Sequence, residues 1–138
     1  DFIVLLTRTA DEIKSDSHYI EYLLKDVQNL TDEHYNMMKG FLKNVDTMFD
    51  NDKAFQAYAT EQTYIALSSM MLTAAMLEID SCPIGGMDKK AVTKILVEEG
   101  LLDTKKFQVT IGCAFGYRAK PATPKKRQPL SEVSTIVK

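Results

Sequence analysis

The residues best suited to chemistry in this sequence form a short basic cluster near its C-terminal end. Lys125, Lys126 and Arg127 lie between Pro124 and Pro129, and prolines lower the cost of ordering a segment around a ligand. Alternate side chains of an extended segment share a side, which pairs Lys125 with Arg127. A lysine charge beside a planar guanidinium suits a phosphate group. Spacing alone leaves two alternatives open: a solvated charge cluster, or a nucleic-acid or nuclear-targeting patch, although interleaved aromatic residues are missing.

A second candidate is a proline–glycine segment. Its two glycines let backbone N–H groups approach a flat or anionic ligand, and a plain turn between strand and helix is the alternative. His18 and His34 have no second ligand or nucleophile at a useful spacing, which predicts surface roles and no metal site. The motifs of serine hydrolases, P-loop NTPases, zinc proteases and Rossmann dehydrogenases are missing, so redox chemistry would require a bound cofactor. The proline–glycine segment named above as the second candidate is Pro83-Ile84-Gly85-Gly86.

Length, charge and cysteine usage limit the possible classes of protein. The chain has 138 residues, which suits one domain with a usable core. A formal net charge of −2 argues against nucleic-acid or membrane binding by bulk charge. Residues 117–138 nevertheless carry six Lys/Arg and one Glu, which favours an anionic ligand near this tail. Cys82 and Cys113 lie in apolar contexts without metal-type spacing, which indicates reduced core residues of a cytoplasmic protein.

Hydrophobic spacing predicts the elements that must position these residues. The apolar run at residues 2–6 predicts a central strand buried on both faces, followed by a polar connection over residues 7–14. Because the chain begins at Asp1 and supplies few other strands, we expect it to be the C-terminal part of a longer protein or a cleavage product. Apolar stripes predict helices over residues 16–30, 31–49 and 88–99, with Ser15 or Asp16, Thr31 and Asp88 as capping residues.

The longest predicted helix spans residues 52–77, with Asn51 as its cap. Its second half is apolar or small on every side, which is typical of an enclosed helix. Two explanations stay open: contact with a second subunit, or a central position within one monomer. The uncharged run at residues 62–77 is shorter than the ~20 apolar residues of a membrane span.

The C-terminal third combines a strand with an extended arm. Strict alternation over residues 107–117 predicts a strand with one unusually small face, as if something packs tightly on it. After Arg118 the chain holds three of its four prolines and no long apolar run, which predicts an extended arm. Residues 129–137 keep enough β-forming residues to add a strand elsewhere, for example on a partner subunit.

Taken together, three motifs in order resemble the C-terminal part of the FMN-dependent nitroreductase family. They are the long helix with residues 61–67, the segment at residues 76–88 and the strand that leads to the basic arm. The resemblance is clearest over residues 54–129 and weakest over residues 15–50. It implies an α+β fold in which helices flank a mixed sheet. It also implies a homodimer built on the long central helix, with an extended C-terminal arm that reaches onto the partner.

The same resemblance implies roles for individual residues. Lys125 and Arg127 correspond to the pair that binds the FMN phosphate. Residues 83–86 correspond to the segment along the flavin ring, with the Gly85 N–H facing flavin N5. Ile65 corresponds to an apolar position near the ring, and Phe41 to an aromatic residue of the substrate pocket. The family uses NADH or NADPH and flat acceptors such as nitroaromatics or quinones, and flavin N5 carries the chemistry without a catalytic side chain.

The chain also departs from the family pattern. The N-terminal part, which supplies the remainder of the flavin site, is missing from this sequence, so residues 1–138 correspond to the C-terminal part of a single domain. Two alternatives follow: a related flavoprotein of the same fold with another substrate, or a truncated, non-catalytic dimerisation or nucleotide-binding fragment. The expected partners are a second copy and a small acceptor, without nucleic acid or membrane.

Overall fold

The centre of the protein is a small sheet, seen in a computed structural model that describes residues 1–137. Its strands are β1 (Phe2–Arg8), β2 (Asp80–Ile84) and β3 (Phe107–Gly116), arranged in the order β1-β3-β2. Both neighbours pair with β3 in antiparallel fashion, so these three strands form an antiparallel sheet in place of the expected mixed one. The prediction that residues 2–6 form the central strand is wrong within the described chain: β3 is central and β1 lies at an edge.

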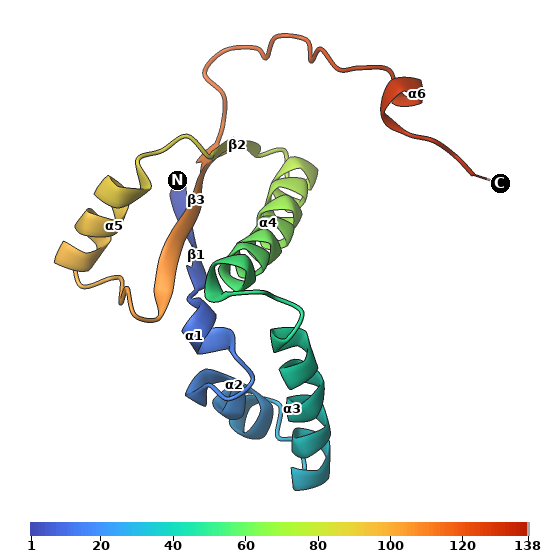
Figure 1. Cartoon of the computed structure of the whole chain (residues 1–138). Coiled ribbons are helices and arrows are strands. Elements are labelled where there is room, and N and C mark those ends of the chain that lie inside the picture. Colours follow the sequence, from blue (N-terminus) through green and yellow to red (C-terminus); the bar gives the residue numbers. More distant parts are fainter. Residues whose placement is uncertain (138) are drawn as a thin grey trace.

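Helices cover both faces of this sheet (Figure 1). Helix α4 (Asp52–Met76) crosses one face, and α5 (Lys89–Glu98) lies on the opposite side. The buried core between α4 and the sheet consists of Leu67, Ile111 and Cys113. This packing confirms the α+β class and the long helix over residues 52–77 to within one residue.

A β-bulge interrupts β3 at Thr110. Leu5 pairs with Ile111, but Leu6 pairs with Val109, so Thr110 has no opposite residue on β1. As a result, Thr110 and Ile111 both reach the α4 side: Thr110 bonds to Thr7, which bonds to Thr63 of α4, while Ile111 packs in the core. The predicted strict alternation over residues 107–117 is therefore wrong, because one extra residue exchanges the faces midway.

The small face of the strand is confirmed after the bulge. A Cβ atom at Gly112 would collide with the ring of Phe2, and it would lie only 3.2 Å from the sulfur of Met87. The first strand and the segment after β2 therefore close tightly over this glycine.

A second helical layer lies away from the sheet, at the bottom of Figure 1. Its core contains Ile20, Leu24 and Tyr35. The predicted helix over residues 16–30 is broken: Ser17, rather than Ser15 or Asp16, caps it, and a π-helical turn replaces its second half. A short helix also occupies part of the predicted polar connection. The four elements are α1 (Ala10–Ile13), α2 (His18–Tyr22), η1 (Leu23–Val27) and α3 (Asp32–Asp46).

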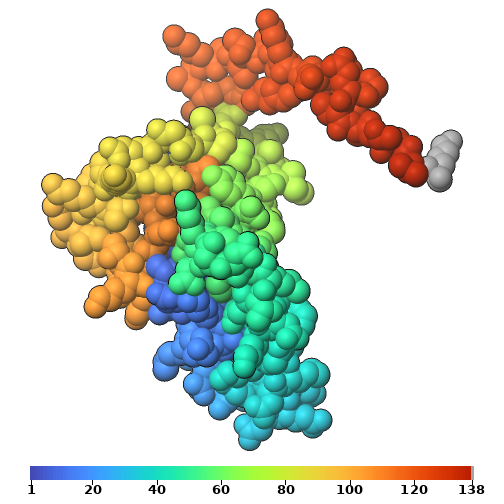
Figure 2. All heavy atoms as spheres, viewed as in Figure 1, coloured from blue at the N-terminus to red at the C-terminus, as the bar shows by residue number. Residues whose placement is uncertain are grey.

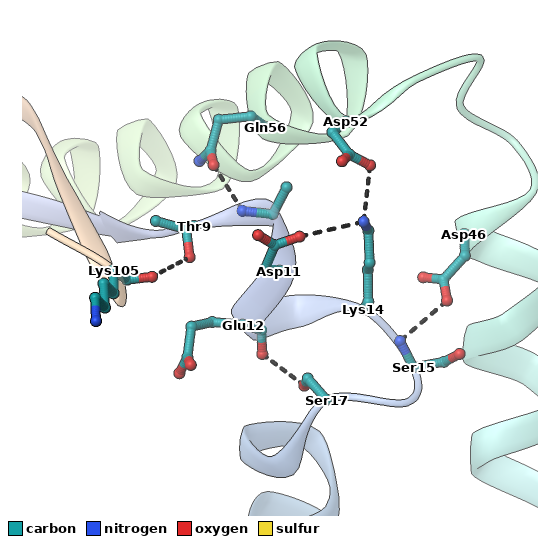
Figure 3. A network of polar contacts seen from close by, with 11 residues as sticks. Thr9, Asp11, Glu12, Lys14, Ser15, Ser17, Asp46, Asp52, Gln56 and Lys105 are labelled. Atoms are coloured by element: carbon teal, nitrogen blue, oxygen red, sulfur yellow. Dashed lines mark hydrogen bonds and ion pairs between the residues drawn. The ribbon is translucent and has the colours of Figure 1, made fainter.

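Polar contacts join this helical layer to α4 and the sheet (Figure 3). Lys14 bridges two carboxylates, with Nζ 2.8 Å from Asp52 and 3.3 Å from Asp11. The Gln56 side chain accepts a hydrogen bond from the Ala10 N–H and donates another to the Arg8 carbonyl. These contacts attach the first turn of α4 and the end of β1 to the same short helix.

Helix α5 is followed by a glycine that ends it. Gly100 has φ +67°, a left-handed conformation that favours glycine, and its N–H donates to the Val97 carbonyl. Of the two leucines that follow, Leu102 is buried and Leu101 is exposed.

The C-terminal arm leaves the body after β3 and extends away from it, along the top of Figures 1 and 2. The extended conformation of residues 119–129 confirms the prediction. The expected β-forming tail instead contains a short helix, α6 (Leu130–Val133). Within residues 1–137, no helix is both long and apolar enough to cross a bilayer.

Candidate functional site

The glycine turn expected to lie along a flavin follows directly from the edge strand β2. Pro83 and Ile84 pair with Cys113 and Gly112 of β3, and Pro suits an edge because it has no N–H to donate. Gly85 and Gly86 come next and are exposed. A Cβ atom at Gly85 would touch only the Ile111 side chain at 3.9 Å, and one at Gly86 would meet nothing within 4 Å. The protein itself leaves space above this turn.

The two cations expected to bind a phosphate lie on the exposed arm. Lys125 lines a hollow of about 660 Å³ at the C-terminal end of α4, together with Asp80, Ser81 and Arg118. Arg127 lines a separate hollow formed by the arm itself, and its Nη1 donates to the Lys126 carbonyl at 2.9 Å. Within residues 1–137 neither cation makes an ion pair, so both charges are available to an anion.

The structure brings Lys125 to the start of β2, but it does not unite the complete expected site. Ile65 is 63% exposed on α4, and Phe41 is 59% exposed on α3. Neither lines a hollow with Lys125 or Arg127, and the glycine turn lines neither arm hollow. In a single chain, the positions expected for the flavin ring, the FMN phosphate and the substrate therefore lie on separate surfaces.

An ion pair beside Lys125 was not apparent from spacing. Asp80 begins β2 and Arg118 follows β3, and the pairing of Asp80 with Gly116 brings them together. The Arg118 backbone N–H and Nε donate to Asp80 Oδ2 at 2.9 and 2.8 Å, and Nη2 contacts Oδ1. The hydrogen bond from the guanidinium holds the pKa of Asp80 below its usual 3.8. The two residues are 38 positions apart, so only the strand register reveals their contact.

The outer face of α4 is apolar and uncovered. We use this name for Ile65, Leu72, Met76 and Leu77, which are all exposed. A hollow of about 440 Å³ continues it toward the sheet and is lined by residues such as Ile3, Met70 and Phe115. The enclosure predicted for the second half of α4 is therefore not provided by this chain.

The remaining candidates play no evident part in a site. His18 and His34 are exposed, as predicted. Cys113 is buried, and its burial raises the pKa of its thiol, but Cys82 is exposed, so the prediction of two core cysteines is half wrong. Neither forms a disulfide. Residues 1–137 contain no group of three His, Cys, Asp or Glu side chains able to hold a metal ion.

The model of the nitroreductase family matches residues 10–117 of this chain. The chain belongs to this family, which confirms the resemblance found in the sequence.

Similar proteins also carry nitroreductase names. The chain is 38% identical over 136 residues to "Putative NAD(P)H nitroreductase YfkO" of Bacillus subtilis, with 96% of this chain and 62% of the relative covered. It is 36% identical over 135 residues to "Putative NAD(P)H nitroreductase SH0546" of Staphylococcus haemolyticus, covering 96% and 61%. The chain thus spans about three fifths of the length of these curated relatives.

Solved structures share the fold. A nitroreductase-named protein, ydfN of Bacillus subtilis, superposes with a TM-score of 0.73 at 20% identity, covering 99% of this chain and 63% of the other. A nitroreductase-named protein of Exiguobacterium sibiricum, solved in complex with FMN, superposes with a TM-score of 0.65 at 16% identity, covering 97% and 60%. At these identities the likeness establishes the fold.

Proposed function

We propose that this chain forms part of an FMN-dependent oxidoreductase that passes hydride from NADH or NADPH to nitroaromatic or quinone-like acceptors. Membership of the nitroreductase family is the observation that carries the proposal. The names of its relatives refer to NAD(P)H, and one neighbour of the same fold binds FMN. When bound, FMN would supply the hydride-accepting and hydride-donating atom N5.

The residues present fit parts of a flavin mononucleotide. The open space above Gly85 and Gly86 suits a flat ring, and the Gly85 N–H is the donor that we assign to the N5 edge. Pro83 and Ile84 hold this turn against β3, because both lie in the paired strand. A fixed backbone donor stabilises charge that develops on a bound ring without reorganisation during the reaction.

The basic arm fits the other end of the cofactor. Lys125 and Arg127 are exposed cations that would bind the phosphate, and a charge-assisted contact of this kind is stronger than a neutral hydrogen bond. Ile65 and Phe41 are the apolar residues that we assign to the ring and to the acceptor pocket. Their exposure leaves them accessible to a ligand or to a second subunit.

We further propose a homodimer in which a second copy covers the outer face of α4. Ile65, Leu72 and Met76 are large apolar side chains exposed along one helix, which is typical of an interaction surface. The arm extends away from its own body (Figure 2), which suits contact with the second copy. The two cysteines without a disulfide fit a reducing, cytoplasmic compartment.

The visible absorption spectrum tests this function. The purified chain is titrated with FMN, reduced anaerobically with NADPH or NADH, and then mixed with a nitroaromatic. We expect flavin absorption that bleaches with a donor and recovers with the acceptor. We also expect FMN binding to weaken in Lys125→Ala/Arg127→Ala but not in Lys120→Ala/Lys126→Ala, a control with the same loss of charge from the same arm.

A different outcome favours the second candidate function. A chain that dimerises but binds no FMN would act as a dimerisation module, which the uncovered α4 face also supports. A flavin that bleaches but transfers nothing to nitroaromatics or quinones would indicate a relative with another substrate.

A further inference from the structure

The point where the chain leaves the sheet is held by one carboxylate. Asp80 accepts from Nε and Nη2 of Arg118 and from the Arg118 backbone N–H. A guanidinium contact alone would fix only a side chain. The additional backbone bond also fixes the direction of the main chain just after β3, because the N–H must point toward Asp80 Oδ2.

The arm that follows is short and restricted. Seven positions separate Arg118 from Lys125, and Pro121 and Pro124 lie between them. Each proline fixes one backbone dihedral angle, so the direction set at Arg118 limits where the arm travels. Lys125 indeed lines the same hollow as Asp80 and Arg118.

We propose that Asp80 and Arg118 form a positioning pair that aims Lys125 and Arg127 at the phosphate of FMN. This inference rests on the proposed function of the arm. The pair does not touch the ligand; it lowers the ordering cost of the arm, so that less of the binding energy is spent on fixing it. Asp80 also neutralises Arg118, which leaves Lys125 as the cation of this hollow that is available to an anion.

The test compares FMN with riboflavin, which has the same ring but no phosphate. The dissociation constants of both are measured by flavin fluorescence for the full chain and for Asp80→Asn, Asp80→Ala and Arg118→Gln. We expect FMN binding to weaken about fivefold in Asp80→Ala and less in Asp80→Asn, which keeps one acceptor oxygen. Riboflavin binding should stay unchanged, whereas general damage to the fold would weaken both ligands equally.

Two controls separate this inference from the proposed function. Glu78→Gln removes a neighbouring carboxylate of the same hollow and should change neither ligand. Lys125→Ala/Arg127→Ala should abolish the preference for FMN over riboflavin. If this double variant loses the preference for FMN, but Asp80→Ala and Arg118→Gln keep it, then Lys125 and Arg127 bind the phosphate and the positioning role of Asp80 and Arg118 is refuted. If the unchanged chain has no preference for FMN, or binds neither flavin, the phosphate site and the positioning pair are both wrong.

Discussion

Replacing Thr7 by Val should destabilise the fold more than replacing Thr110 by Val, although Thr110 is the more deeply buried. Their exposed fractions are 5% and 1%. The difference lies in the chain of hydroxyl groups that links the sheet to α4. Thr7 is the middle member: it contacts Thr110, and its Oγ1 lies 2.6 Å from that of Thr63.

The expected magnitudes follow from the groups that each change leaves behind. Thr110→Val removes one hydrogen bond, but Thr7 keeps Thr63 as a partner, so the loss should be about 1 kcal/mol. Thr7→Val removes both bonds and leaves the hydroxyl of Thr110 buried without its partner, which should cost about 2–3 kcal/mol. In the double variant that orphaned hydroxyl is absent. The double variant should therefore lose about 1 kcal/mol less stability than the sum of the losses in the two single variants.

Urea unfolding of the wild type, the two single variants and the double variant measures all three quantities in one double-mutant cycle. Thr104→Val is the control, because Thr104 is exposed and its replacement should change stability by less than ~0.5 kcal/mol. Equal losses in the two single variants, or simple additivity, would refute the hydroxyl chain as the link between the sheet and α4.

Three further perturbations test separate features of the fold. Gly40→Ala should stabilise α3 by roughly 1 kcal/mol in thermal unfolding, because a Cβ there meets nothing within 4 Å; unchanged or lower stability would contradict this. Gly100→Ala should destabilise by about 1 kcal/mol, because φ is +67° at the end of α5, and a neutral result would show that the turn relaxes. Arg118 lowers the pKa of Asp80, so the contribution of this ion pair to folding stability is present above pH 3.8 and is lost as the pH falls further. The stability difference between wild type and Asp80→Asn should therefore shrink below that pH, and a constant difference down to pH 2 would oppose this assignment.

Local signals were sufficient to predict several helix beginnings. Thr31, Asn51 and Asp88 each accept a hydrogen bond from a backbone N–H of the first turn, as expected of capping residues. Capping depends on residues within about one turn, so a short stretch of sequence contains the required information.

Features that depend on distant partners were harder to predict. The position of β1 at an edge depends on which strands pair, and the bulge at Thr110 depends on the register with Leu5 and Leu6. The same holds for the site. The basic cluster between two prolines singled out Lys125 as a candidate cation, but the contact between Asp80 and Arg118 requires the register of β2 on β3.

The bulge at Thr110 also determines how this sequence should be aligned with others. Deleting Thr110 itself would restore regular pairing along β3 and keep Ile111 and Cys113 on the α4 side, because Val109 and Ile111 already pair with the adjacent residues Leu6 and Leu5. A length change elsewhere in β3 would instead exchange the faces of the residues beyond it. Length changes should therefore be tolerated in the loop between α5 and β3 and selected against inside the strand at positions other than the bulge. A gap placed nearer the C-terminal end of β3 would therefore align core positions such as Ile111 with residues that face solvent.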